Sequence, residues 1–166
     1  MDFTKQLQTW AKSDALQGRI MLIVGIDLLI TLYLLLQNNS SFSQGMLIPL
    51  GVLLMINIGY GGFLAYARPR HIKSATKLYK EQPQQALQQE LKKSLQDNRN
   101  YTMFKPIWTG LIFLSLAAYF FLTDAYYQGL ALSLAILFLG VLLIDVFLHR
   151  HLKPYLALLQ QLIKTK

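Results

Sequence analysis

The chain has 166 residues, of which 54% are apolar, 14% are charged and none is cysteine. Soluble domains usually carry about 25% charged residues, so the composition excludes an ordinary soluble fold, and the missing cysteines exclude thiol chemistry, Cys-ligated metals and disulfide scaffolds. In a soluble protein the net charge of +8 would suggest a nucleic-acid partner. Here the cations flank long apolar segments, which points to a membrane and to no nucleic acid.

Four apolar segments are each long enough to cross a lipid bilayer. A helix rises about 1.5 Å per residue, so roughly 20 apolar residues match the ~30 Å hydrocarbon core. Short polar turns separate the first segment from the second and the third from the fourth. The sequence therefore predicts an all-α, polytopic integral membrane protein whose four transmembrane helices form two tandem hairpins. The predicted spans are 20–36, 46–67, 106–123 and 129–148.

The rest of the chain is patterned as amphipathic helix. The predicted division is an N-terminal interfacial helix (1–18), the first hairpin (19–67), a basic helical loop (68–105), the second hairpin (106–148) and a C-terminal amphipathic helix (149–166). The two hairpins share a plan, because Gln44-Gly45 and Gln128-Gly129 occupy equivalent places after the two polar turns. This likeness suggests a parallel repeat.

The distribution of cations predicts the orientation in the membrane. Three Lys or Arg residues precede the first span, nine lie between the second and third spans, and four follow the fourth span. These are all 16 Lys and Arg residues of the chain, so the two short turns contain none. The positive-inside rule then places both termini and the basic loop in the cytoplasm. The small size and short turns favour a bacterial inner (plasma) membrane.

The N-terminal segment carries an apolar stripe. Phe3, Leu7 and Trp10 fall at helical spacing, with a tryptophan of the kind found at membrane interfaces. We expect this helix to lie on the membrane surface until Ser13 or Asp14 caps a turn into the first span. Asp2 and Asp14 precede that span and no cleavage site follows it, so we expect a retained helix rather than a signal peptide.

Polar residues inside a bilayer are costly and are therefore candidates for function. Asp27 and Thr31 lie one turn apart in the first span, and Asn57 and Tyr60 of the second span are expected at a similar depth. One interpretation of this intramembrane polar cluster is a proton or cation site at Asp27. The other is a structural hydrogen bond between helices, or a pairing of Asp27 with Arg68 or Arg70.

Glycines in the second span indicate close helix packing. The sequence Ile58-Gly59-Tyr60-Gly61 resembles a potassium filter, but Arg68 follows too soon for a pore helix and a further span. Small residues at helical spacing instead predict a face on which another helix packs. That predicted face consists of Gly51, Met55, Gly59, Gly62 and Tyr66.

The basic loop is predicted to contain two helices separated by Pro83. The first of these helices has a cationic face suited to anionic lipid headgroups, because each cation near the membrane surface contributes about 1 kcal/mol. This basic face consists of Arg70, Lys73, Lys77 and Lys80. The second helix carries an apolar stripe of Leu87, Leu91 and Leu95.

The C-terminal segment has the clearest amphipathic pattern. Its stripe includes Leu152, Tyr155, Leu156, Leu159, Leu162 and Ile163. The apolar stripes either pack on one another and on the headgroup region, or one of them docks a partner helix.

Four residues are predicted near the inner membrane interface. Asp145 and His149 are one helical turn apart, a spacing at which their side chains can pair with each other. Together with His151 and His71 they could also bind a metal or phosphate, although interfacial histidines are usually only polar boundary residues. We expect no metal, no other cofactor and no catalytic residue.

The predicted function is non-enzymatic: a scaffold, regulator or immunity-type membrane protein that acts through its cytoplasmic helices and anionic lipid. The alternative is a small transporter or channel that uses Asp27 and assembles as a homo-oligomer, because four spans enclose little volume. An interfacial enzyme using His149, His151 and Asp145 is the third option. The expected partners are lipids with anionic headgroups, further copies of the chain or another membrane protein.

Overall fold

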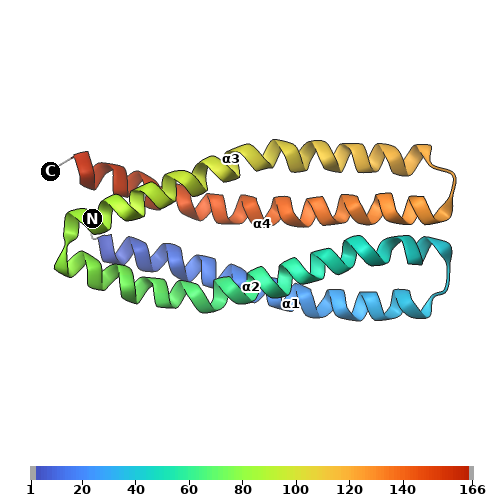
Figure 1. The fold of residues 1–166 in the computed structure, drawn as a ribbon, viewed down its shortest axis with the longest axis horizontal. Helices are drawn as coiled ribbons and strands as arrows, with labels where there is room; N and C mark the ends of the chain where they lie inside the picture. The colour runs from blue at the N-terminus through green and yellow to red at the C-terminus, as the bar shows by residue number, and fades with distance from the viewer. Residues whose placement is uncertain (1–2, 165–166) are drawn as a thin grey trace.

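The computed structural model describes residues 3–164, which form four α-helices (Figure 1). They are α1 (Phe3–Gln37), α2 (Ser41–Glu81), α3 (Pro83–Phe121) and α4 (Ala125–Lys164). Each helix contains an apolar stretch long enough to cross a membrane. The prediction of an all-helical chain with four helices able to cross a membrane is therefore confirmed. Residues 1, 2, 165 and 166 end the predicted terminal segments and lie outside the described residues.

The four helices run side by side along the long axis of the molecule (Figure 1). Both chain ends and the α2–α3 connection at Gln82 lie at one end, which we call the terminal end. Two short connections, residues 38–40 and 122–124, lie at the other, which we call the turn end. Helix α1 packs along α2, α3 packs along α4, and the two pairs meet chiefly through α2 and α4.

Helix α1 is continuous, so the predicted turn at Ser13 or Asp14 is wrong. The Ser13 hydroxyl donates a hydrogen bond to the Thr9 carbonyl one turn earlier, within the helix. The Asp14 side chain is buried and binds Arg68 of α2. Neither side chain is therefore available to cap a new helix. The predicted break at Pro83 is confirmed, because α2 ends at Glu81 and Pro83 occupies the first turn of α3, where its missing N–H has no bond to lose.

The apolar stripes of the four helices meet at the terminal end and form the main core. Tyr155 and Leu159, from the C-terminal stripe, are almost completely buried. The stripes therefore cover one another, and these two residues are not free to dock a separate partner helix. The buried members of this core are Phe3, Leu7, Trp10, Ala11, Ala75, Leu87, Leu152, Tyr155 and Leu159.

At the turn end the two helix pairs touch backbone to backbone. A Cβ atom on Gly45 of α2 would overlap the Tyr126 carbonyl oxygen, and a Cβ atom on Gly129 of α4 would overlap the Phe42 carbonyl oxygen. Each glycine thus faces the carbonyl three residues before the other glycine. Helices α1 and α3 end 84 residues apart, at Gln37 and Phe121, and α2 and α4 begin at positions 41 and 125, again 84 apart.

The predicted glycine packing face is wrong. A Cβ atom on Gly51, Gly59 or Gly62 would meet nothing within 4 Å. Instead, α1 and α2 approach closely at Gly18 and Gly61, where a Cβ on Gly18 would lie 2.6 Å from the Gly61 carbonyl oxygen. The prediction failed because a span facing lipid and a span facing a helix can both be apolar, so spacing alone does not identify the contacting side.

We predict that Gly129→Ala lowers the free energy of unfolding, whereas Gly59→Ala does not. The methyl group at position 129 would collide with the backbone of α2, and overpacking of this kind costs about 1–3 kcal/mol. At position 59 the methyl group meets open space. Reversible unfolding of both variants in detergent would measure the difference, and equal stability of the two would contradict the close contact of α2 with α4.

Candidate functional site

The most deeply buried carboxylate in the described residues, that of Asp14, forms an ion pair between α1 and α2. The Arg68 guanidinium lies 2.9 Å from the Asp14 carboxylate, and their side chains are 10% and 2% exposed. The guanidinium also lies over the Trp10 ring, 4.4 Å from its centroid. Burial raises the pKa of Asp14 to about 6, although the nearby positive charge of Arg68 opposes this shift.

A second polar network joins the other helices to this pair. The Tyr155 hydroxyl of α4 donates to the Glu90 carboxylate of α3 at 2.9 Å, and His71 Nε2 of α2 lies 3.1 Å from the same carboxylate. Burial alone would raise the pKa of Glu90, but the hydrogen bond and charge of His71 and the hydrogen bond from Tyr155 outweigh burial and lower it. Tyr155 also stacks on Trp10, with ring centroids 4.8 Å apart. We call these residues the terminal-end network; it consists of Trp10, Asp14, Arg68, His71, Glu90 and Tyr155.

Sequence reasoning missed this network. Arg68 was considered as a cation that sets orientation and as a partner for Asp27, and Asp14 as a helix cap and as a charge that precedes the first span. One signal was present, because Asp14 occupies the next position of the stripe formed by Phe3, Leu7 and Trp10. An acid on the apolar face of an amphipathic helix indicates a buried charge that needs a cationic partner.

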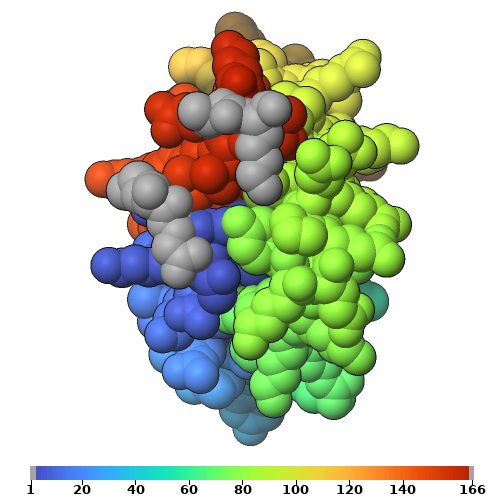
Figure 2. Space-filling view, turned by 90° about the vertical axis from the view of Figure 1, so that its left-hand side faces the viewer, coloured from blue at the N-terminus to red at the C-terminus, as the bar shows by residue number. Residues whose placement is uncertain are grey.

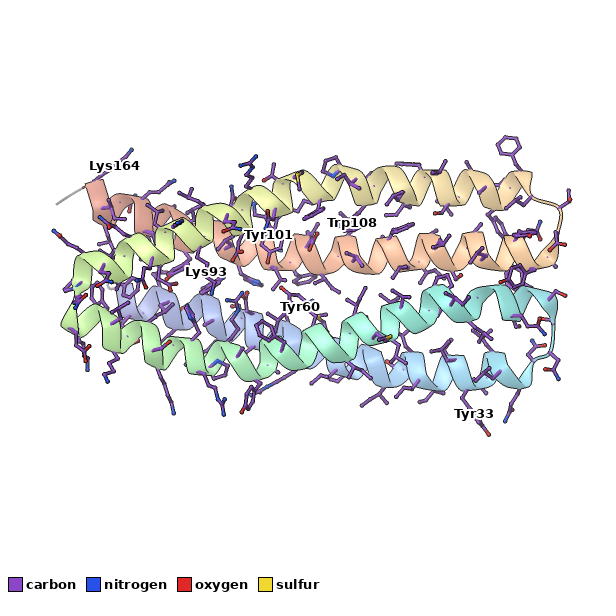
Figure 3. The ribbon with its side chains drawn as sticks, in the orientation of Figure 1. Tyr33, Tyr60, Lys93, Tyr101, Trp108 and Lys164 are labelled. Atoms are coloured by element: carbon purple, nitrogen blue, oxygen red, sulfur yellow. The ribbon has the colours of Figure 1, made fainter. Side chains whose placement is uncertain are left out.

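A cavity of about 310 Å³ opens beside the network between α2 and α3. Its lining includes Arg68, Lys93 and Asp97, together with Tyr60 and Tyr101. Figure 3 shows Lys93 and Tyr101 on α3 and Tyr60 on α2, where the two helix pairs face each other. Burial raises the pKa of Asp97, against the effect of the neighbouring charges of Arg68 and Lys93. Cations and one carboxylate therefore lie together around this cavity.

The predicted intramembrane polar cluster is not assembled. Asp27 is exposed, and Thr31 donates its hydroxyl hydrogen to the Asp27 backbone carbonyl rather than to the carboxylate. Asn57 is buried, and its amide donates to the Leu53 carbonyl of its own helix at 2.9 Å. Tyr60 is 36% exposed. Helix α1 faces α2 through Gly18, Met21 and Gly25, which leaves Asp27 on another side.

The predicted inner-interface cluster is also dispersed. Asp145 accepts a hydrogen bond from Trp108 Nε1 at 2.9 Å instead of pairing with His149. His149 is held by two α3 side chains: its Nδ1 accepts from the Lys105 ammonium, so its Nε2–H donates to Asn98 Oδ1 at 2.8 Å. Burial, followed by the charge of Lys105, lowers the pKa of His149.

The remaining two histidines do not join this group. His71 belongs to the terminal-end network, and the Nδ1 atom of His151 is buried without a hydrogen-bond partner. Within residues 3–164 no three His, Asp or Glu side chains are grouped so that they could hold a metal ion. The arrangement predicted for a metal or phosphate is therefore not formed by these four residues.

The basic face is present on the outer surface of α2. Arg70, Lys73, Lys77 and Lys80 are all exposed. Arg70 lies over the Tyr66 ring at 3.9 Å, and Lys77 lies 3.9 Å from the Glu81 carboxylate on the following turn. These contacts leave the ammonium groups accessible to ligands in solution or at a membrane surface. Comparisons with models of protein families, with curated proteins and with solved structures gave no match.

We predict that Arg68→Met destabilises the protein strongly and that adding Asp14→Leu restores most of the loss. Removing one member of a buried pair leaves an uncompensated charge, which costs about 3–5 kcal/mol, whereas replacing both members with apolar groups is nearly neutral. Unfolding free energies of the single and double variants in detergent would give the coupling between the two positions.

The pH dependence of the unfolding free energy provides a second test of the Asp14–Arg68 pair. Without Arg68, the carboxyl of Asp14 is neutralised only by a proton, so the folded protein binds that proton more tightly than the unfolded chain does. The stability of Arg68→Met should therefore rise as the pH falls from 7 toward 4, while the double variant should lack this rise. Additive losses in the double variant would argue against a coupled pair.

Proposed function

We propose that this chain is a non-enzymatic membrane protein that acts as a scaffold, regulator or immunity-type protein. In this proposal its two tandem hairpins span a bacterial inner membrane, and its amphipathic helical ends lie in the cytoplasm against anionic lipid. The observation that carries the proposal is the basic face of Arg70, Lys73, Lys77 and Lys80, which stays exposed while apolar residues of all four helices are buried in the core at the same end.

Two features support a binding role rather than a chemical one. The ionisable groups of the terminal-end network are bound to partners on neighbouring helices, so they serve to hold the helices together. The accessible charges of α2, by contrast, have the sign that attracts the anionic cytoplasmic leaflet. Large apolar side chains remain exposed along the spans, for example Phe113 and Phe120 at 69% and 78%, and these suit contact with lipid or a partner membrane protein.

The proposed orientation predicts opposite accessibility of the two ends. The chain has no cysteine, so single cysteines can be introduced and labelled without background. Tyr127→Cys, beside the second turn, should react with a membrane-impermeant maleimide on intact cells. Lys80→Cys, on the basic face, should react only after the membrane is permeabilised. The wild-type protein is the blank, and the reverse labelling pattern would contradict the orientation.

A small oligomeric transporter or channel is the second candidate, and the position of Asp27 favours it. This carboxyl lies among Ile23, Ile26 and Ile30, which are more than half exposed. A charged group facing lipid costs about 2.5–3.5 kcal/mol at the membrane centre, so binding a proton, a cation or a further copy of the chain would stabilise it.

Flux measurements separate the two candidates. If the chain is a transporter, proteoliposomes should show proton or cation flux that Asp27→Asn abolishes, while Asp124→Asn in the second turn leaves it intact. If the chain is a scaffold, the wild-type protein and both variants should give the same low flux as empty vesicles. Flux that is unaffected by Asp27→Asn would contradict a role for this residue.

A further inference from the structure

We propose that a groove between α1 and α2 at the terminal end binds the phosphate headgroup of an anionic phospholipid. This inference rests on the proposed function, because it places the groove at the cytoplasmic membrane surface. It goes further by assigning the lipid to one site, of which only Lys73 belongs to the basic face.

The groove has a volume of about 550 Å³ and an apolar floor with cations around it. Helix α1 contributes Lys12 and Arg19, which lie two turns apart on one side of the helix. Helix α2 contributes Lys73. The floor includes Ala15, Pro69 and Ile72. In Figure 2 the blue surface of α1 adjoins the green surface of α2 at this end of the molecule.

The charge of the groove is uncompensated. Lys12, Arg19 and Lys73 are exposed, and none of them forms an ion pair with another residue of the described chain. No carboxylate lines the groove. Three cations that line one groove without a carboxylate among the lining residues favour an anion that can accept several charge-assisted hydrogen bonds, which is the property of a phosphate group.

The cavity between α2 and α3 is a weaker candidate for an anion. It also contains two cations, Arg68 and Lys93. However, Arg68 is already bound to Asp14, and Asp97 lies in the lining itself. An anionic ligand there would have to displace or approach a carboxylate, whereas the α1–α2 groove presents only positive charge.

The depth of the groove indicates a lipid rather than a soluble anion. Arg19 directly precedes the predicted span 20–36, so the cations lie at the level expected for headgroups. On the same side of α1, Leu16, Ile20 and Ile23 are 58%, 45% and 60% exposed and continue toward the turn end. A phosphate held by the cations would therefore have its acyl chains directed along an apolar helix surface.

The test compares two triple variants that remove equal charge. The groove variant is Lys12→Gln/Arg19→Gln/Lys73→Gln, and the matched control, which lies outside both the groove and the basic face, is Lys5→Gln/Lys92→Gln/Arg99→Gln. The full chain in detergent is titrated with phosphatidylglycerol, and native mass spectrometry gives the dissociation constant of the first bound lipid. All six side chains are exposed, so both variants should fold, which thermal unfolding would verify.

We expect the groove variant to raise the dissociation constant of the first bound phosphatidylglycerol by about tenfold or more, since each groove cation contributes several-fold to binding. The control variant should raise this constant by about threefold or less. The wild-type protein should bind phosphatidylcholine of the same chain length more weakly than phosphatidylglycerol. Equal weakening by both variants would overturn the groove site but leave the proposed lipid role. No preference for phosphatidylglycerol in the wild-type protein would overturn both, and displacement of the lipid by millimolar inorganic phosphate would reassign the groove to a soluble anion.

Discussion

The positive charge of the buried Arg68 guanidinium is compensated by a carboxylate and an aromatic ring of the neighbouring helix α1. Asp14 supplies the carboxylate and Trp10, one turn earlier in α1, supplies the ring. Tyr155 of α4 stacks on that ring and donates to Glu90 of α3. One buried charge thus constrains residues from all four helices, and the apolar stripes at the terminal end pack around the arrangement that it imposes.

Polarity along the chain was sufficient to predict four helices able to cross a membrane, because segment length and apolar content determine that property directly. Pro83 was correctly identified as a break, whereas the other four prolines, Pro49, Pro69, Pro106 and Pro154, lie inside helices. Partner choice was less predictable. Asp27 and Asn57 were expected to meet at a common depth, yet Asn57 lies buried in the α1–α2 contact beside Gly25, whereas Asp27 is exposed. The position of a residue in the sequence gives the depth of its side chain along the helix. The direction in which the side chain faces depends on how the helix is rotated about its axis, which is determined by packing.

The two ends of the bundle are held together by different physical means. At the terminal end, aromatic stacking and ion pairs join α1 with α2 and α4 around buried apolar side chains. At the turn end, Gly45 and Gly129 instead bring two helix backbones into direct contact. Exposed side chains such as Met55 and Phe113 then line the outer surface of the spans.

The mutual contact of Gly45 and Gly129 has the geometry of an isologous interface, in which each half presents the same surface to the other. Gly45 faces the carbonyl of Tyr126 and Gly129 faces the carbonyl of Phe42, so the same interaction occurs twice about a local pseudo-twofold axis. Because the contact is self-complementary, a substitution in one half that changes the distance between α2 and α4 also alters the contact made by the other half. Enlarging either glycine displaces the backbone of the opposite half, and substitutions at the two positions are therefore coupled.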